Sequence, residues 1–151
     1  MESKIDKTRR IRKNSNMPRR IHRSNKSKTI VIIRFALPGF HCWPKAPNWC
    51  KYLREIHRHL FYFEAGIKVS ELDREVEIID FANKVKNTLM EKFKNKIEWE
   101  DLLVGVNFNS MSCEMIAEDV SKIIKDLHQK PEYVTVLEDN ENGAKWINNE
   151  I

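Results

Sequence analysis

Two histidines, His57 and His59, are separated by one residue, and a third, His41, precedes them. Residues two apart in a strand leave the same face, with Cβ atoms about 6.5–7 Å apart. Here that face also carries Phe61 and Phe63, where a charged, unpartnered imidazole is costly and a neutral metal-bound one is not. His41 adds a third nitrogen if the two segments pair as a hairpin. Three histidines and one open position are typical of a catalytic zinc site.

The His-x-His spacing by itself also fits a plain strand. In that alternative, His57 and His59 bond to backbone groups or to carboxylates such as Glu55. Spacing alone favours this alternative, so the surrounding elements have to decide between the two.

Two strands are expected to carry these histidines. β-Branched residues dominate Thr29 to Leu37, and Pro38-Gly39 follows, which predicts a buried strand ending in a turn. A loop over His41 to Tyr52 comes next. His57 to Val69 then alternates between apolar and polar residues, which predicts a second strand with one core face.

The first of two predicted helices follows these strands. It is marked by apolar residues four apart at Phe81, Val85, Leu89 and Phe93, with Asp80 as the expected N-cap.

The second helix and two further strands complete the pattern. Ser112 is the expected cap of this helix, whose apolar face carries Ile116, Val120, Ile123, Ile124 and Leu127. Pro131 ends the helical region. Tyr133 to Leu137 and Ala144 to Ile147 read as strands joined at Asn142-Gly143. The order ββααββ predicts an α+β domain with two helices on one face of an antiparallel sheet.

Size and composition limit the protein class. A chain of 151 residues with 41% apolar residues corresponds to one domain. Its apolar runs are far shorter than the ~20 residues of a membrane span, and it begins with no apolar signal region. We therefore expect a soluble, cytoplasmic protein without a membrane partner. Three cysteines, an odd and small number, argue against a disulfide framework and leave thiol or metal chemistry open.

Positive charge is concentrated at the N-terminus. Residues 1–29 hold 11 Lys and Arg against two acids, whereas residues 30–151 hold 16 against 20. Residues 1–28 lack an apolar period, so we expect a disordered basic tail before a domain at 29–151. Such a tail could bind nucleic acid by counterion release. It has no aromatic residue for base stacking, and a solubilising extension, or a stretch upstream of the true start, is the alternative.

Five short blocks resemble the 6-pyruvoyl-tetrahydropterin synthase / 6-carboxytetrahydropterin synthase family, in family order, from about Ile30 to Trp146. The blocks are Arg34-Phe35-Ala36 with His41, His57-Arg58-His59, Glu77 to Ala82, Ser112 to Ala117, and Val134 to Glu138. The resemblance implies a T-fold (tunnelling fold) assembled into a ring oligomer with sites between subunits. It also implies a zinc-dependent lyase of pterin or queuosine biosynthesis, acting on dihydroneopterin triphosphate or a related purine or pterin ring.

The resemblance also implies roles for particular residues. His41, His57 and His59 would bind zinc, while Glu138 would hold the guanidine-like edge of the ring and Glu114 would contribute to substrate binding.

Glu138 also shares strand parity with the apolar Val134 and Val136, so its carboxylate would face inward and need a bidentate donor. A pterin edge is one such donor, and an ion pair with Arg34 or Arg54 is the alternative.

The chain departs from the family pattern at its catalytic groups. Leu53 stands four residues before His57, where the family has its catalytic cysteine. Cys50, or less readily Cys42, could replace it, because a thiol beside zinc has a lowered pKa; either could equally be a passive loop residue.

The family's Asp-His pair has no counterpart either, since the segment 102–109 has no histidine and Asp101 is the nearest acid. We therefore expect an enzyme, with a pterin- or nucleotide-binding module without turnover as the alternative.

Overall fold

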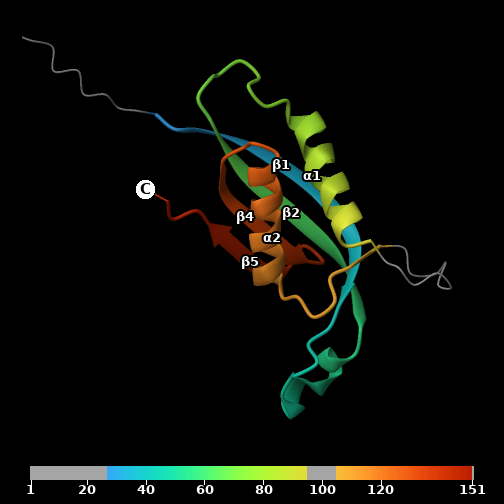
Figure 1. Ribbon diagram of the computed structural model, residues 1–151. Helices are drawn as coiled ribbons and strands as arrows, with labels where there is room; N and C mark the ends of the chain where they lie inside the picture. Colours follow the sequence, from blue (N-terminus) through green and yellow to red (C-terminus); the bar gives the residue numbers. More distant parts are fainter. Residues whose placement is uncertain (1–26, 95–104, 151) are drawn as a thin grey trace, which may run out of the picture.

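The computed structural model describes residues 27–94 and 105–150 (Figure 1). Most of the predicted basic tail, residues 1–26, and the acid Asp101 lie outside the described residues. In chain order the elements are β1 (Thr29–His41), the 3-10 helix η1 (Asn48–Arg54), β2 (His57–Val69), α1 (Ile78–Lys92), β3 (Val106–Asn107), α2 (Cys113–Asp126), β4 (Pro131–Glu138) and β5 (Asn142–Ile147).

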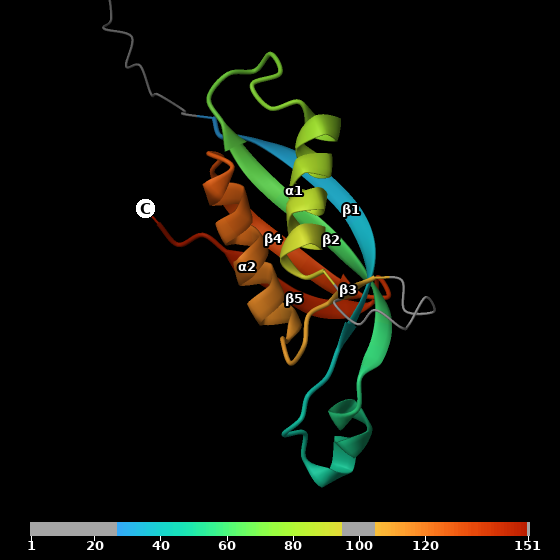
Figure 2. The same cartoon turned by 45° about the vertical axis from the view of Figure 1, so that its right-hand side comes forward.

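One five-stranded mixed sheet organises the domain, in the order β3-β1-β2-β4-β5. The pairs β1–β2, β2–β4 and β4–β5 are antiparallel, and β3 runs parallel to β1. Helix α1 packs over β1 and α2 over β4 and β5, so both helices cover the same face (Figure 2). The predicted α+β class with helices on one face is confirmed. The purely antiparallel ββααββ order is wrong, because two residues of β3 are too few to show an alternating pattern.

The first two strands form a long hairpin. Their register runs from Thr29 opposite Val69 to His41 opposite His57. Strand β2 has the predicted bounds, and its odd-numbered residues face the helices, as the buried Phe61 shows.

The prediction that the first strand ends in a turn at Pro38-Gly39 is wrong, because β1 continues through both residues to His41. A Cβ on Gly39 would lie 2.9 Å from the ring of Phe61 and 3.1 Å from that of Phe108. Glycine therefore allows close packing at this position. It does not mark a turn.

The helix caps explain where each helix begins. Glu77, and not Asp80 as predicted, caps α1, because its carboxylate accepts hydrogen bonds from the N–H groups of Ile79 and Asp80. Ser112 caps α2 as predicted, by accepting from the N–H of Met115. The helices have 15 and 14 residues, and none in the described ranges is long and apolar enough to cross a bilayer.

The C-terminal strands are slightly longer than predicted. Strand β4 begins at Pro131 itself, which needs no N–H donor as the first residue of a strand. Strand β5 begins at Asn142, so the predicted turn at Asn142-Gly143 is wrong: these two residues pair with Glu138 and Leu137, and the chain turns at residues 139–141, where Asp139 and Asn140 have positive φ. The core lies between the sheet and the helices and includes Phe61, Val85, Ile116, Ile124 and Val136.

Candidate metal centre

The three histidines converge at one end of the β1–β2 hairpin. His41 is the last residue of β1 and pairs with His57, the first residue of β2, while His59 lies opposite Gly39. Ring centroids are 4.6 Å apart for His41 and His57, 5.1 Å for His57 and His59, and 5.3 Å for His41 and His59. One nitrogen from each ring lies within 4.8 Å of the other two. The predicted convergence of the three side chains is confirmed, and they are close enough to hold one metal ion.

Backbone carbonyls fix two of the rings. Nδ1 of His41 donates to the carbonyl oxygen of Met111 at 3.0 Å, and Nδ1 of His57 donates to that of Glu55 at 2.9 Å. A carbonyl oxygen only accepts, so Nδ1 carries the proton in both rings. In the neutral form, Nε2 therefore keeps a free lone pair, which is how metal-binding histidines are commonly held.

A carboxylate fixes the third ring. Nδ1 of His59 donates to Asp139 at 2.7 Å, and the other carboxylate oxygen of Asp139 accepts from the N–H of Leu60 at 2.9 Å. The hydrogen bond from His59 is the main reason that the pKa of Asp139 is lowered. Sequence reasoning missed Asp139. Its residue type could have marked a turn after β4, because Asp readily adopts the left-handed conformation found here, with φ at 52°.

Nε2 of His41 is the clearest sign that these residues suit a metal ion. This atom is buried and has no hydrogen-bond partner of acceptable geometry, although a carboxylate oxygen of Glu138 lies 3.1 Å away. Burial lowers the pKa of His41, which keeps Nε2 unprotonated. A buried lone pair without a donor fits a cation and is costly without one.

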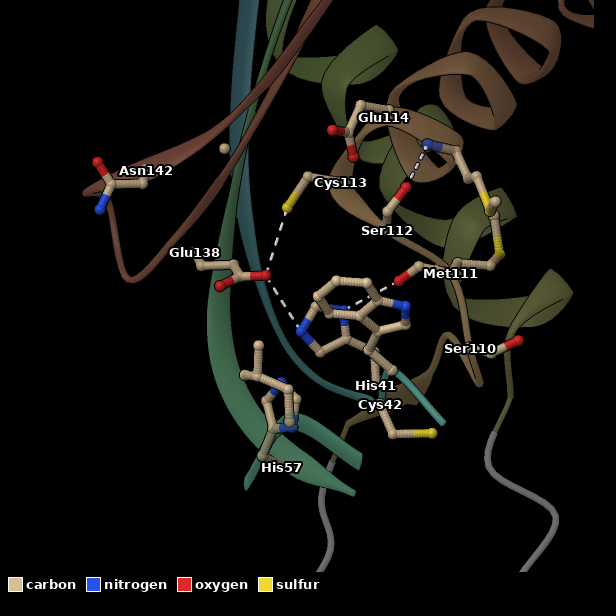
Figure 3. Close-up of a pocket in the computed structure, with 14 residues that line it drawn as sticks. His41, Cys42, His57, Ser110, Met111, Ser112, Cys113, Glu114, Glu138 and Asn142 are labelled. Atoms are coloured by element: carbon tan, nitrogen blue, oxygen red, sulfur yellow. Dashed lines mark hydrogen bonds and ion pairs between the residues drawn. The ribbon is translucent and has the colours of Figure 1, made fainter. Parts of the chain in front are cut away.

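Glu138 sits beside the histidines and contacts a cysteine from α2. Its carboxylate lies 3.4 Å from Nε2 of His59. It also accepts from the thiol of Cys113 at 3.5 Å (Figure 3). Arg34 and Arg54, the alternative partners, instead bind Glu64 and the carbonyl of Ala46.

Cys113 is the second residue that sequence reasoning missed. Burial, followed by the charge of Glu138, raises the pKa of the Cys113 thiol to about 12, so the group is a protonated donor at neutral pH.

A cavity of about 510 Å³ opens next to the histidines. It is lined by His41 and His57 from the hairpin, Glu138 from β4, and Cys113 and Glu114 from the start of α2 (Figure 3). Both predicted substrate-binding carboxylates therefore face the same space as the histidines.

The predicted catalytic cysteines separate in the structure. Cys42 lines the cavity and is partly exposed. Cys50 is fully buried in η1 and is not among the lining residues. Leu53, at the position of the family's cysteine, does line the cavity, so an apolar side chain stands where the resemblance implies a thiol.

Comparison with known proteins supports the fold only. No family model and no curated protein sequence matches the chain. The crystal structure of uncharacterized protein WS1659 from Wolinella succinogenes is similar, with a TM-score of 0.53 and 14% sequence identity. The match covers 82% of this chain and 99% of that one. At this identity the likeness indicates a shared α+β architecture and carries no information about activity.

Proposed function

We propose that the protein is a zinc-dependent T-fold protein, similar to 6-pyruvoyl- and 6-carboxytetrahydropterin synthases, that acts on a pterin- or purine-type ring. The observation that carries this proposal is the convergence of His41, His57 and His59. The Nδ1 atom of each ring is bound elsewhere, and each Nε2 is left for a metal. Three imidazoles suit zinc, but iron and nickel accept them too, so the metal has to be identified by measurement.

The residues around the cavity would have different roles in binding the metal, binding the ring and moving a proton. Bound zinc would supply a Lewis acid that polarises a substrate oxygen. Glu138 and Glu114 offer carboxylate oxygens to N–H donors on the edge of a ring. Cys42 is the predicted catalytic cysteine that reaches the cavity, so it is our candidate for moving a proton, whereas the raised pKa of Cys113 suits it to donating a hydrogen bond.

Binding without turnover is the second candidate function. It is favoured by Leu53 in place of the family's cysteine and by the burial of Cys50 away from the cavity. Loss of a positioned general base typically slows a reaction by about 10²–10⁴-fold. The ring and the metal could therefore still bind while the reaction fails.

Assembly into a ring is part of the proposal. The sheet ends in the two-residue strand β3 on one side and in β5 on the other. An open β edge favours pairing with another chain, and a ring of subunits would cover such edges. Light scattering on the full-length protein should give a molar mass that is a multiple of the 18.0 kDa of one chain. A monomer would contradict the ring but not the metal centre.

Metal content and product formation test the function. We expect about one zinc per chain by elemental analysis of the purified protein, and loss of the metal in His57→Ala and His59→Ala. His128→Asn is the matched control, because His128 is exposed after α2 at a positive φ that Asn tolerates. Conversion of dihydroneopterin triphosphate would separate the enzyme from the binding module. A purified protein without stoichiometric metal would contradict both candidate functions, the enzyme and the binding module.

A further inference from the structure

Glu138 directs its carboxylate at two of the three histidines. One oxygen lies 3.1 Å from Nε2 of His41, and the other lies 3.4 Å from Nε2 of His59 (Figure 3). The approach to His41 is not a hydrogen bond, because that Nε2 is buried without a partner. Since Nδ1 of His41 donates to Met111, the neutral ring turns a lone pair toward the carboxylate oxygen. Two acceptor atoms this close repel each other unless a cation lies between them.

The spacing of these atoms is that of ligands around one metal ion. Ligands about 2.0–2.1 Å from zinc at tetrahedral angles are about 3.3–3.4 Å from each other. The two contacts of Glu138, at 3.1 Å and 3.4 Å, are close to this spacing. Carboxylate oxygens and imidazole nitrogens are both common zinc ligands. Glu138 is therefore placed as a fourth ligand beside the three histidines.

The carboxylate of Glu138 has no cationic side chain of Lys or Arg to balance it. Among residues 27–94 and 105–150, none of these side chains pairs with it, and none lines the cavity. The side-chain donor that does reach it, the thiol of Cys113 at 3.5 Å, is uncharged. A divalent ion would supply the charge that this carboxylate lacks. In return, the carboxylate would offset one of the two positive charges placed among three neutral rings.

The backbone fixes Glu138 in this position. As the last residue of β4, it lies opposite Phe61 of β2 and Asn142 of β5. The next residue, Asp139, binds Nδ1 of His59 at 2.7 Å. Two consecutive carboxylates therefore lie at the two nitrogens of one ring. Asp139 is at the nitrogen that faces away from a metal, where carboxylates commonly orient a ligating histidine, and Glu138 is at the nitrogen that faces it.

We infer that Glu138 is the fourth ligand of the metal before any substrate binds, so that three histidines and one glutamate form a closed site. This inference rests on the metal of the proposed function and goes beyond it, because that function needs an open fourth position and uses Glu138 only to hold the ring. A ring could then reach the metal only after the carboxylate leaves it. The alternative is an ion pair between Glu138 and a protonated His59, with the fourth position open.

The zinc affinity of the full chain, measured by competition with a chromogenic chelator, tests the role of Glu138. Glu138→Gln keeps the size of the side chain, but an amide binds zinc much less well than a carboxylate does. We expect the affinity to fall by more than the ~10–100-fold that is typical of a residue that only orients a ligand. A loss of ~100-fold or less would overturn the inference.

Glu141→Gln is the matched control for this measurement. Glu141 is an exposed residue of the turn between β4 and β5, so the substitution removes the same charge three residues away. Its zinc affinity should equal that of the unmodified protein. A loss as large as that of Glu138→Gln would show that charge near the site, and not coordination, sets the affinity, and would overturn the inference.

Access of an external ligand tests the closed site in the unmodified protein. Co²⁺ binds the same donors as zinc and has a visible spectrum that shifts when a ligand is exchanged. Free imidazole at pH 8 is the probe, because it is uncharged and its binding does not depend on the charge of the carboxylate. We expect imidazole to shift the spectrum of Co²⁺-loaded Glu138→Ala and to leave that of the unmodified protein unchanged. The same shift in both proteins would overturn the inference.

The inference and the proposed function fail differently. A purified chain without stoichiometric zinc contradicts both. Zinc that is bound with an open fourth position, as shown by imidazole binding to the unmodified protein, overturns the inference and leaves the proposed function standing. Melting temperatures of the metal-free variants exclude loss of folding as the cause of a lost affinity.

Discussion

Asp139 has the clearest supporting role of any single residue near the candidate metal centre. Its carboxylate holds Nδ1 of His59 at 2.7 Å, and loss of such a partner typically weakens metal binding by about 10–100-fold. We expect Asp139→Asn to show this loss in a competition assay with a chromogenic chelator. Asn tolerates the positive φ at this position, so the backbone should be unaffected.

The control for this prediction is Asp73→Asn. Asp73 is exposed and, within residues 27–94 and 105–150, its only ion pair is with its neighbour Arg74. Unchanged zinc affinity in Asp139→Asn would show that the orientation of His59 does not depend on the carboxylate.

The candidate site could be predicted from the sequence only in part. His41, His57 and His59 were predictable because strand parity and a hairpin fix their relative positions. Cys113 and Asp139 were not, because each approaches the site from an element far along the chain. Their contacts, to Glu138 and His59 respectively, depend on how α2 and the β4–β5 turn pack.

Gly39 decides whether β1 can continue to the candidate metal centre. Gly39→Ala would place a methyl group 2.9 Å from the buried ring of Phe61, and overpacking of this kind costs about 1–3 kcal/mol. We expect a lower free energy of unfolding in urea, together with weaker metal binding, since Gly39 pairs with His59. Pro38→Ala adds no bulk and should cost less. A neutral Gly39→Ala would mean that the site has room for a Cβ.

The N-cap of α1 is a second test at the scale of an element. Glu77 accepts from two N–H groups, at 3.2 Å from Ile79 and 2.7 Å from Asp80. Glu77→Ala should therefore lower the free energy of unfolding by about 0.5–2 kcal/mol. Asp80→Ala is the comparison, because Asp80 pairs with Lys84 on the helix surface, and an exposed pair of this kind contributes about 0.3–0.5 kcal/mol. If Asp80→Ala were the more damaging, the cap assignment would be wrong.

The elements that could be predicted were those with a long periodic pattern of apolar and polar residues. The alternation in β2 extends over 13 residues and gave the observed bounds. The predicted end of the first strand at Pro38-Gly39 is wrong because local turn propensity takes no account of the tertiary packing of Phe61 and Phe108 on Gly39. Propensity likewise favoured Asp80 as a cap over the longer side chain of Glu77, which reaches the same N–H groups.

At the scale of the whole molecule, a polar cluster joins three strands away from the candidate metal centre. Glu64 of β2 accepts from Arg34 of β1 at 2.7 Å and from the hydroxyl of Tyr133 of β4 at 2.8 Å. The three residues lie across the centre of the sheet, so the cluster couples the histidine hairpin to the strand that carries Glu138.

This cluster makes stability depend on pH at both ends of the range. The hydrogen bond from Tyr133 is the main cause that lowers the pKa of Glu64 below its ordinary 4.5. The folded state therefore binds this proton less readily than the unfolded state. The stabilisation is present above about pH 4.5 and is lost as the pH falls through the lowered value.

The alkaline side has the opposite sign. Burial, and next the hydrogen bond to Glu64, raise the pKa of Tyr133 from 10 to about 12. Its stabilisation is present below pH 10 and is lost as the pH rises towards 12. Tyr133→Phe should flatten both limits of a profile of unfolding free energy against pH. Glu64→Gln should reduce the acid loss, and the exposed Glu141→Gln should leave the profile unchanged. An acid limit in Tyr133→Phe as steep as in the unmodified protein would show that other carboxylates set it.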